Sequence, residues 1–445
     1  MMFKKAFPEE IGFDKKSIAV SMILVVNAFI WYFYAFNFLM EVVNQAEFSD
    51  FLTLTIWGIN LLGIAISAIL STFLIDKFKR RITFLLCWML AGVVVSLTPI
   101  AIDVATWSGL IIVSAFLGAY FGLGIPVCLG YYAAATEVRN RSRLSGITFL
   151  MVGIGFFLLS SIAIKGILLN SLTLAALRTV GVLTLFFLKP DEKQINKKNR
   201  VSYGFIFRNK SFLLYFVPWI MFALVNYVAG PVSNKLFPDD LVYYTIIIEN
   251  ILSGVFAVVC GFFADFLGRK RLAVTGFALL GLGYAILGLF PGNLWGLWFY
   301  TAVDGIAWGA FYTIFLLTVW GDLAQEQSSE KYYAIGSLPF ILSIFMRLSI
   351  GAYVTDNVPE SAVFSFASVF LFLAVLPLIY APETLPEKTM KERELKKYVE
   401  KAQKEAEKAQ KKEAEKTPWE NGDDGVEFEA NQELEEIQKE VEKYY

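Results

Sequence analysis

The sequence contains no histidine and three well-separated cysteines, and each scarcity excludes a class of site. Without histidine, the chain lacks the commonest protein metal ligand and the side chain that usually exchanges protons near neutral pH. Cys87, Cys128 and Cys260 form no Cys-x-x-Cys pair, so neither a disulfide framework nor a zinc site is indicated. We therefore expect no metal site, no cofactor and no enzymatic activity, and any transferred proton must be carried by a carboxylate.

Charge is also scarce. Charged residues make up 18% of the 445 residues and hydrophobic residues 56%, against about 25% and 45–50% in soluble domains. Phenylalanine alone occurs 41 times. The net charge of −1 gives no reason to expect a nucleic-acid partner. The composition indicates an integral membrane protein whose surroundings are a lipid bilayer.

Twelve apolar segments are long enough to cross a bilayer, which requires about 20 residues at ~1.5 Å per residue. Six lie in the first half of the chain and six in the second: Ile18–Met40, Phe51–Ile75, Ile82–Ile102, Trp107–Ala135, Leu144–Ile164, Leu168–Leu188, Phe212–Val232, Leu241–Ala264, Leu272–Phe290, Trp295–Trp320, Tyr332–Val354 and Ala362–Ala381.

Basic residues predict the orientation of these spans, because Lys and Arg concentrate in cytoplasmic loops. With both termini inside, the inner segments up to Lys331 hold 22 Lys and Arg, and the outer loops hold only Lys165 and Lys235. We expect a multi-pass protein of the plasma membrane with both termini in the cytoplasm.

Three landmarks recur along the chain at nearly one offset. Asp76 matches Asp265 at an offset of 189, Glu137 matches Asp322 at 185, and Pro190-Asp191 matches Pro382-Glu383 at 192. Six spans per repeat give both copies the same orientation, which is the parallel-repeat plan of many transporters. The expected fold is all-α, with bundles at 1–188 and 212–382, a cytoplasmic linker at 189–211 and a soluble, charged helical tail at 383–445.

The loop after the eighth span carries a recognisable motif. Gly261, Asp265, Gly268, Arg269 and Lys270 are spaced as G-x-x-x-D-x-x-G-R-K, which resembles the loop motif of the major facilitator superfamily. Its first copy contains Asp76, Arg80 and Arg81 but has Thr72 and Lys79 in place of the glycines. Pro382-Glu383-Thr384, after the last span, resembles the ending common in the sugar and organic-ion branches.

An acidic residue at the inner end of one helix gains from the positive N-terminus of the next helix and from nearby Arg. We therefore expect a conformational clasp formed by Asp76, Arg80, Arg81, Gly261, Asp265, Gly268 and Arg269. The alternative for the first copy is that its basic residues only set the topology at the lipid headgroups.

Four ionisable residues fall deep within spans: Arg178, Glu249, Asp304 and Arg347. Each charge there costs ~2.5–3.5 kcal/mol even on a lenient scale, so each requires a partner, a wet cavity or a neutral form. One interpretation makes Asp304 and Glu249 proton carriers, with Arg347 favouring an anionic solute. The other is a permanent Asp304–Arg347 pair that fixes two helices together. Arg178 lies on a helix that the resemblance makes peripheral, so it is expected to contact lipid, the other half or a neighbouring subunit.

Aromatic and polar residues follow one face of three spans that the resemblance assigns to the walls of a central cavity. They are Asn27, Trp31 and Tyr34 on the first span, Asn226 on the seventh, and Asp304 with Trp308 on the tenth. Aromatic walls with few polar anchors suit an organic solute better than a bare ion. The alternative for any single aromatic is ordinary helix packing.

These features predict a monomeric secondary active transporter that moves a small organic solute by alternating access, with protons as the candidate coupling ion. The rival hypothesis is a transport-inactive membrane sensor on the same scaffold that signals through its C-terminal tail. The Glu- and Lys-rich tail has helix-supporting pairs such as Glu392 with Lys396. The sequence alone does not define the substrate, the direction of transport or the coupling ion.

Overall fold

A computed structural model describes residues 15–46, 48–162, 164–190, 201–225, 229–324, 328–385 and 408. Every regular element within these ranges is helical. The tail that the sequence predicts to be a soluble helix lies outside the described residues, apart from residues 383–385 and Lys408.

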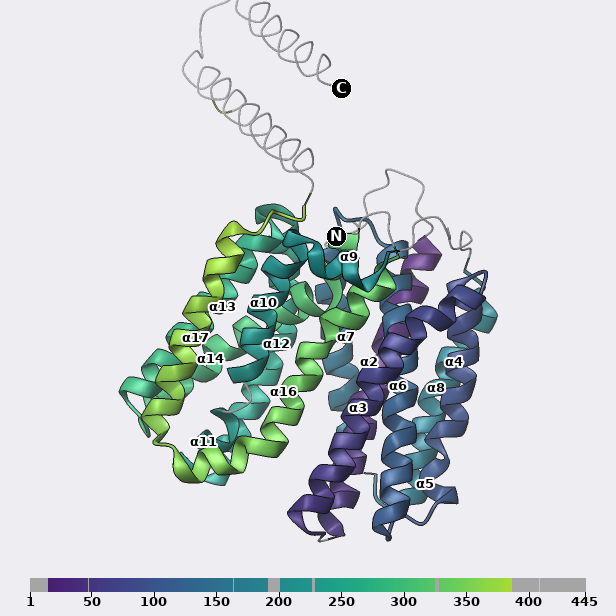
Figure 1. The fold of residues 1–445 in the computed structure, drawn as a ribbon, viewed down its shortest axis with the longest axis horizontal. Helices are drawn as coiled ribbons and strands as arrows, with labels where there is room; N and C mark the ends of the chain where they lie inside the picture. The colour runs from purple at the N-terminus through teal and green to yellow at the C-terminus, as the bar shows by residue number, and fades with distance from the viewer. Residues whose placement is uncertain are drawn as a thin grey trace, which may run out of the picture. The chain divides into compact units, whose positions relative to one another are not determined.

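The first half of the chain forms a bundle of long helices (Figure 1). Its elements are α2 (Lys15–Gln45), α3 (Asp50–Leu74), the short 3-10 turn η1 (Ile75–Lys77), α4 (Arg81–Ser96), α5 (Thr98–Ala101), α6 (Trp107–Ala135), α7 (Arg141–Ser161) and α8 (Ile167–Leu188). α9 (Tyr203–Arg208) lies in the predicted linker. Below, the first half means α2 to α8.

The second half repeats this plan from α10 onward. Its elements are α10 (Lys210–Val225), α11 (Ala229–Leu236), α12 (Asp239–Leu267), α13 (Arg269–Leu289), α14 (Leu294–Phe311), the π-helical segment η4 (Tyr312–Thr318), α15 (Val319–Ala324), α16 (Ser329–Asn357) and α17 (Glu360–Tyr380). α14, η4 and α15 follow one another without a break, so together they form the predicted tenth span.

Within the described residues, eleven helices are long and apolar enough to cross a membrane, against twelve predicted spans. The difference lies at the predicted span 212–232, where α10 ends at Val225 and α11 begins at Ala229. Gly230 and Pro231 account for the separate start of α11, because proline cannot donate to a preceding helical turn and is tolerated in the first turn of a new helix. Residues 226–228 between the two helices lie outside the described residues.

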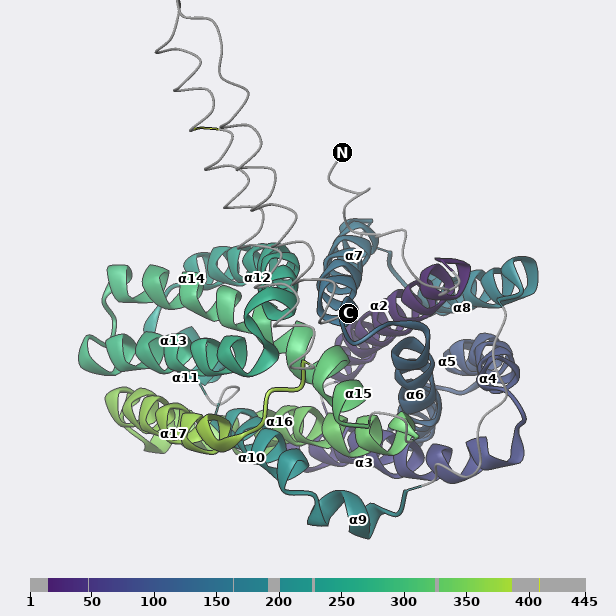
Figure 2. The same ribbon diagram turned by 90° about the horizontal axis from the view of Figure 1, so that it is seen from above.

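The two halves meet along a few helices. Seen from above, α2, α3, α4, α6 and α8 gather on one side and α12, α13, α14 and α17 on the other (Figure 2). α7 of the first half packs against α12 of the second, and α16 of the second half packs against α3 of the first. The interior is therefore bounded by helices of both repeats.

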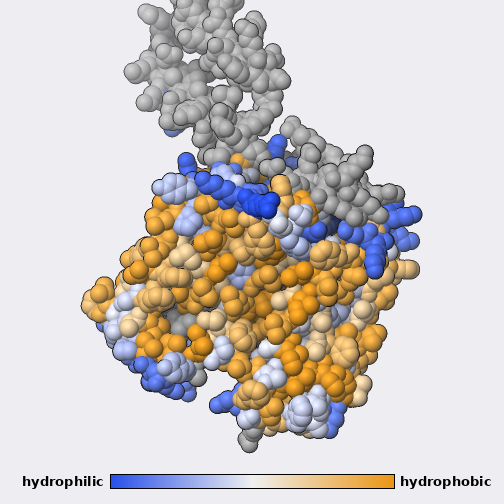
Figure 3. Space-filling model, viewed as in Figure 1, coloured by the Kyte–Doolittle hydropathy of each residue, from blue (hydrophilic) through white to orange (hydrophobic). Residues whose placement is uncertain are grey.

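The outer surface matches a bilayer. Large apolar side chains such as Phe187, Leu168 and Phe366 are exposed on the outward faces of α8 and α17. The space-filling view shows an apolar surface between two more polar ends on the face that includes α17 (Figure 3). One of these ends, called the basic end below, carries Arg81, Arg143 and Lys270 near the starts of α4, α7 and α13.

Candidate functional site

A central cavity lies between the two halves. α2, α3 and α6 line it from the first half, and η4, α15 and α16 line it from the second. Apart from Ser337 and the tyrosines, the lining is wholly apolar: Phe29, Tyr32, Ile64, Phe121, Ile125, Leu129, Phe315, Leu316, Trp320, Tyr333, Ser337, Phe340 and Ile341. Tyr32 and Phe121 stack with ring centroids 4.1 Å apart, so one wall is a fixed aromatic surface. Such a lining favours an organic group over a hydrated ion.

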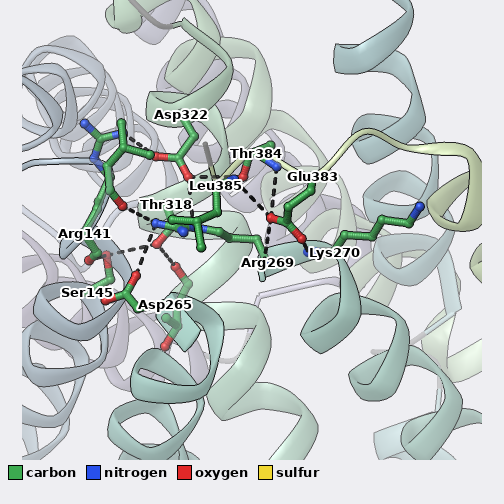
Figure 4. Close-up of polar contacts among 12 residues, drawn as sticks. Arg141, Ser145, Asp265, Arg269, Lys270, Thr318, Asp322, Glu383, Thr384 and Leu385 are labelled. Atoms are coloured by element: carbon green, nitrogen blue, oxygen red, sulfur yellow. Dashed lines mark hydrogen bonds and ion pairs between the residues drawn. The ribbon is translucent and has the colours of Figure 1, made fainter. Parts of the chain in front are cut away.

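Ion pairs join the two halves at the basic end. Three of them cross from the first half to the second: Arg81 with Glu330, Arg141 with Asp322, and Arg143 with Asp265. Arg269 adds two pairs inside the second half, to Asp265 and Asp322. We call these seven residues the gate network, and Figure 4 draws its central part.

Asp322, in α15, is the centre of the gate network. Its Oδ1 accepts a hydrogen bond from Arg141 Nη1 at 2.5 Å, while its Oδ2 lies 3.1 Å from Arg269 Nε. Thr384, just beyond α17, donates its hydroxyl to the same Oδ2 at 3.1 Å. Both arginines and Asp322 are buried, so each charge depends on the others for compensation.

Asp265, near the C-terminal end of α12, links α7 to the same network. Its Oδ2 accepts hydrogen bonds from the backbone nitrogen of Arg143 at 3.1 Å and from Nε of that residue at 3.0 Å. Its Oδ1 lies 3.2 Å from Arg269 Nη2. The side chain of Asp265 therefore neutralises one arginine from each half.

Glu330 holds the first turn of α16 against α4 and α6. Its carboxylate accepts hydrogen bonds from Arg81 Nε and from the hydroxyl of Ser328. It is buried against Gly130 of α6, where an added Cβ would lie 2.8 Å from Glu330 Cγ. The absence of a side chain at position 130 lets the carboxylate reach Arg81.

Glu383 caps the N-terminus of α13. Its carboxylate oxygens accept hydrogen bonds from the backbone nitrogens of Arg269 at 2.8 Å and Lys270 at 3.1 Å, where the helix dipole favours a negative charge. Gly268 precedes the helix with a φ of 102°, and a Cβ there would lie 2.2 Å from Glu383. Glycine is required at position 268 for both reasons.

The structure brings together only part of the predicted clasp. Asp265, Gly268 and Arg269 lie at the gate network, and Arg81 of the first copy joins it through Glu330. Asp76 lies in η1, and Arg80 precedes α4 without an ion pair among the described residues.

Sequence reasoning did not select Arg141, Arg143, Asp322 or Glu330 as site residues. All four lie at helix ends on the basic side, where charge also serves as a topology signal. The sequence signal that could have drawn attention to Arg141 and Glu330 was the internal repeat. These two residues are 189 positions apart, the same offset that relates Asp76 to Asp265.

The ionisable residues predicted deep in the spans of the second half form a cluster on α12, α14 and α16. The side chains of Glu249 and Asp304 lie close enough to interact, and Tyr300 is a further neighbour of Asp304. Arg347 acts electrostatically on Glu249. Glu249 thus interacts with both of the other ionisable residues predicted deep in the spans of the second half, Asp304 and Arg347.

The predicted polar face of the first span turns into its own half. Asn27 donates to the carbonyl of Leu177 at 2.6 Å, Trp31 to Ser96 at 2.9 Å, and Tyr34 to Asn170 at 2.5 Å. The neighbouring face of α2, with Phe29 and Tyr32, lines the cavity instead.

Trp308 and Asn226 were also predicted to line the central cavity. Trp308 packs edge-on against the cavity residue Phe340 at 6.4 Å between centroids. Asn226 lies outside the described residues.

Arg178 has a different environment from the one expected for a peripheral helix. Its side chain has no exposed surface and lies inside the first half, so the expectation of contact with lipid, the other half or a neighbouring subunit is wrong. It faces inward because α8 packs this face against α2 and α4, where aromatic rings cover the guanidinium.

Comparison with known proteins identifies related chains. The family profile described as Major Facilitator Superfamily matches residues 20–248 and 241–421. A curated protein of Bos taurus, hippocampus abundant transcript-like protein 1, is 27% identical over 184 residues, which is 40% of this chain. That match spans 35% of the length of the bovine protein, about a third.

Two solved structures show the same fold. The crystal structure of the human organic anion transporter MFSD10 (TETRAN) is similar with a TM-score of 0.61 at 12% identity, over 82% of this chain and 99% of that one. The proton:xylose symporter XylE, bound to 6-bromo-6-deoxy-D-glucose, gives a TM-score of 0.58 at 15% identity, over 83% of this chain and 96% of that one.

Proposed function

Because this chain belongs to the major facilitator superfamily, we propose that it is a secondary active transporter that moves a small organic solute by alternating access. The observation that carries the proposal is one cavity lined by both halves, together with ion pairs that join the two halves at the basic end. A rocking motion that breaks these pairs would open the cavity at the basic end. The pairs and the cavity are thus two parts of one transport cycle.

The basic end is the cytoplasmic side in this proposal, since Lys and Arg accumulate there. The structure then represents the state that is closed toward the cytoplasm. In this state the gate network acts as the clasp, and Asp265 and Arg269 serve as conformational residues that do not contact the solute.

The solute in this proposal has an apolar or aromatic body, because the hydroxyl groups on the described cavity lining are limited to those of Ser337, Tyr32 and Tyr333. Arg347, beside Glu249, favours an anionic solute. MFSD10 is named an organic anion transporter and XylE a proton:xylose symporter. The largely apolar lining supports the first type of solute better than a sugar.

Counterflow in proteoliposomes tests transport directly. Vesicles loaded with unlabelled aromatic solutes are expected to accumulate the labelled solute transiently, and Phe121→Ala should reduce this signal about tenfold by removing one cavity wall. Phe366→Ala, on an outward-facing surface of α17, is the matched control and should transport normally. Absence of counterflow for every solute tested would favour the alternative of a transport-inactive sensor.

Proton coupling is proposed for Glu249 and Asp304. Two adjacent carboxyl groups in a membrane interior hold one proton between them at least cost, because both cannot ionise side by side. Glu249→Gln and Asp304→Asn are expected to abolish uptake driven by a pH gradient while counterflow, which needs no net proton movement, continues. Uptake is measured with and without an imposed pH gradient. Full pH-driven uptake by both variants would contradict the assignment.

A further inference from the structure

Arg178, in the middle of α8, is a fully buried arginine held by aromatic rings. Its guanidinium carbon lies 4.4 Å from the ring centroid of Trp31, 4.7 Å from Trp88 and 5.1 Å from Tyr120. We call these three rings the aromatic cage. Nη1 donates to Asn27 Oδ1 at 3.0 Å, whereas Nε and Nη2 have no hydrogen-bond partner among the described residues.

The charge of Arg178 has no opposite charge beside it in the described part of the chain. Its electrostatic neighbours there are the phenol of Tyr120 and the thiol of Cys128, neither of which is a carboxylate. Arginine remains protonated in proteins, and cation–π contacts stabilise the charge without neutralising it. Arg347 differs, because it interacts with Glu249. Within the described residues of the first half, no carboxylate therefore compensates the positive charge of Arg178, which lies in the middle of a helix long enough to cross a membrane.

This charge lies directly behind the cavity wall. Two residues of the aromatic cage, Trp31 and Tyr120, are followed in the chain by Tyr32 and Phe121, which line the cavity and stack on each other. α2 and α6 are thus the layer between Arg178 and the cavity, about one helix diameter or ~10 Å thick. The intervening side chains, such as Trp31, Tyr120 and Phe121, are buried and uncharged, so mobile ions screen the charge little across this layer.

We propose that Arg178 is a specificity-determining residue that gives the apolar cavity a positive potential and makes it select organic anions over neutral analogues of the same shape. It acts through its field and not by contact with the solute. Across ~10 Å at an effective dielectric constant of about 20, one charge predicts a preference of roughly tenfold. The inference rests on the proposed transport function and names the substrate class.

The test compares binding of matched probes to the purified full-length protein. Benzoate, 4-phenylbutyrate and 2-naphthoxyacetate are titrated beside their neutral primary amides, with tryptophan fluorescence and thermal stabilisation as readouts. Wild type is expected to bind the carboxylates about tenfold more tightly than the amides. Arg178→Met should bring this ratio close to one, whereas Arg178→Lys, which disturbs the same packing but keeps the charge, should retain most of it.

If Arg178 had a merely structural role, its substitution would weaken the binding of carboxylates and amides equally, and Arg178→Met and Arg178→Lys would have the same effect. That result would overturn the proposal. Equal binding of both probe classes by wild type would also overturn it, while leaving the proposed transport function intact. Failure of wild type to bind any of the six probes would count against the proposed function and the inference together.

A second variant keeps the proposal testable if the Arg178 variants do not fold. Cys128→Asp places a carboxylate beside Arg178 without removing the guanidinium, and Cys128→Ser is its neutral control. The Asp variant is expected to lose the anion preference and the Ser variant to keep it. An unchanged preference in Cys128→Asp would overturn the proposal.

Discussion

Replacing Asp322 by asparagine is expected to lower the transport rate by a hundredfold or more. The substitution leaves Arg141 and Arg269 buried without their shared carboxylate, and breaking a buried pair costs about 3–5 kcal/mol. Because Arg141 belongs to the other half, most of this cost falls on the state closed at the basic end. The population of that state, and with it the completed transport cycle, should fall accordingly.

Counterflow measures the rate, and a cysteine in the cavity reports the closure. In a background with Cys87, Cys128 and Cys260 replaced by serine, Ser337→Cys should resist a membrane-impermeant maleimide added at the basic end. Asp322→Asn should make this cysteine reactive. Labelling from that side would still be blocked if Asp322 did not hold the gate closed.

Glu137→Gln is the matched control for Asp322→Asn. Glu137 occupies the position that the internal repeat relates to Asp322, and it lies on the same basic side. Its side chain takes part in no ion pair among the described residues. The transport rate and the labelling of Ser337→Cys should therefore both stay near wild type in Glu137→Gln. If the transport rate fell as far as in Asp322→Asn, the net charge of this end would matter more than the specific ion pairs.

Valine at position 146 or 261 should block closure by steric contact. A Cβ on Gly146 would lie 2.2 Å from the carbonyl oxygen of Ala257, and one on Gly261 would lie 2.5 Å from that of Ser142. Both contacts are with backbone atoms of the opposite half, which cannot rotate away as a side chain can. Separating α7 from α12 would remove the Arg143–Asp265 pair as well, so we expect transport to fall by at least a hundredfold.

Gly254→Ala provides the comparison on the same helix face. A Cβ at this position would lie 3.5 Å from Leu150 Cδ1, an ordinary contact with a flexible side chain, so transport should change less than twofold. Closure can be followed by the same cysteine labelling. Normal transport in Gly146→Val and Gly261→Val would show that α7 and α12 need not approach closely during the cycle.

The loop motif and the partners of its residues differ in how far the sequence could predict them. The spacing of Gly261, Asp265, Gly268 and Arg269 was visible because a tight connection between two helices is a local feature. The partner of Asp265 in the other half, Arg143, is 122 residues away, and nothing local to either residue identifies the pair. The clasp function of these residues remains a prediction for the gate variants to test.

Asn27 and Arg178 show the same limit inside one half. Helical spacing placed Asn27, Trp31 and Tyr34 on one face of α2 but did not reveal which neighbour that face meets. The structure turns the face toward α4 and α8, where Arg178 contacts Asn27 and Trp31. An arginine in an apolar span signals an unusual environment, but its three aromatic neighbours come from three other helices.

The sequence by itself determined the membrane class, the repeat and nearly all of the spans. This was possible because a segment in lipid must satisfy its own backbone hydrogen bonds, so about 20 apolar residues define a helix without reference to the rest of the chain. Only the tertiary structure decided which charges meet at the basic end, which face of α2 lines the cavity, and that Arg178 is caged inside the first half. The physical reason is that helix rotation and pairing depend on packing between side chains far apart in sequence, which local hydrophobicity does not encode.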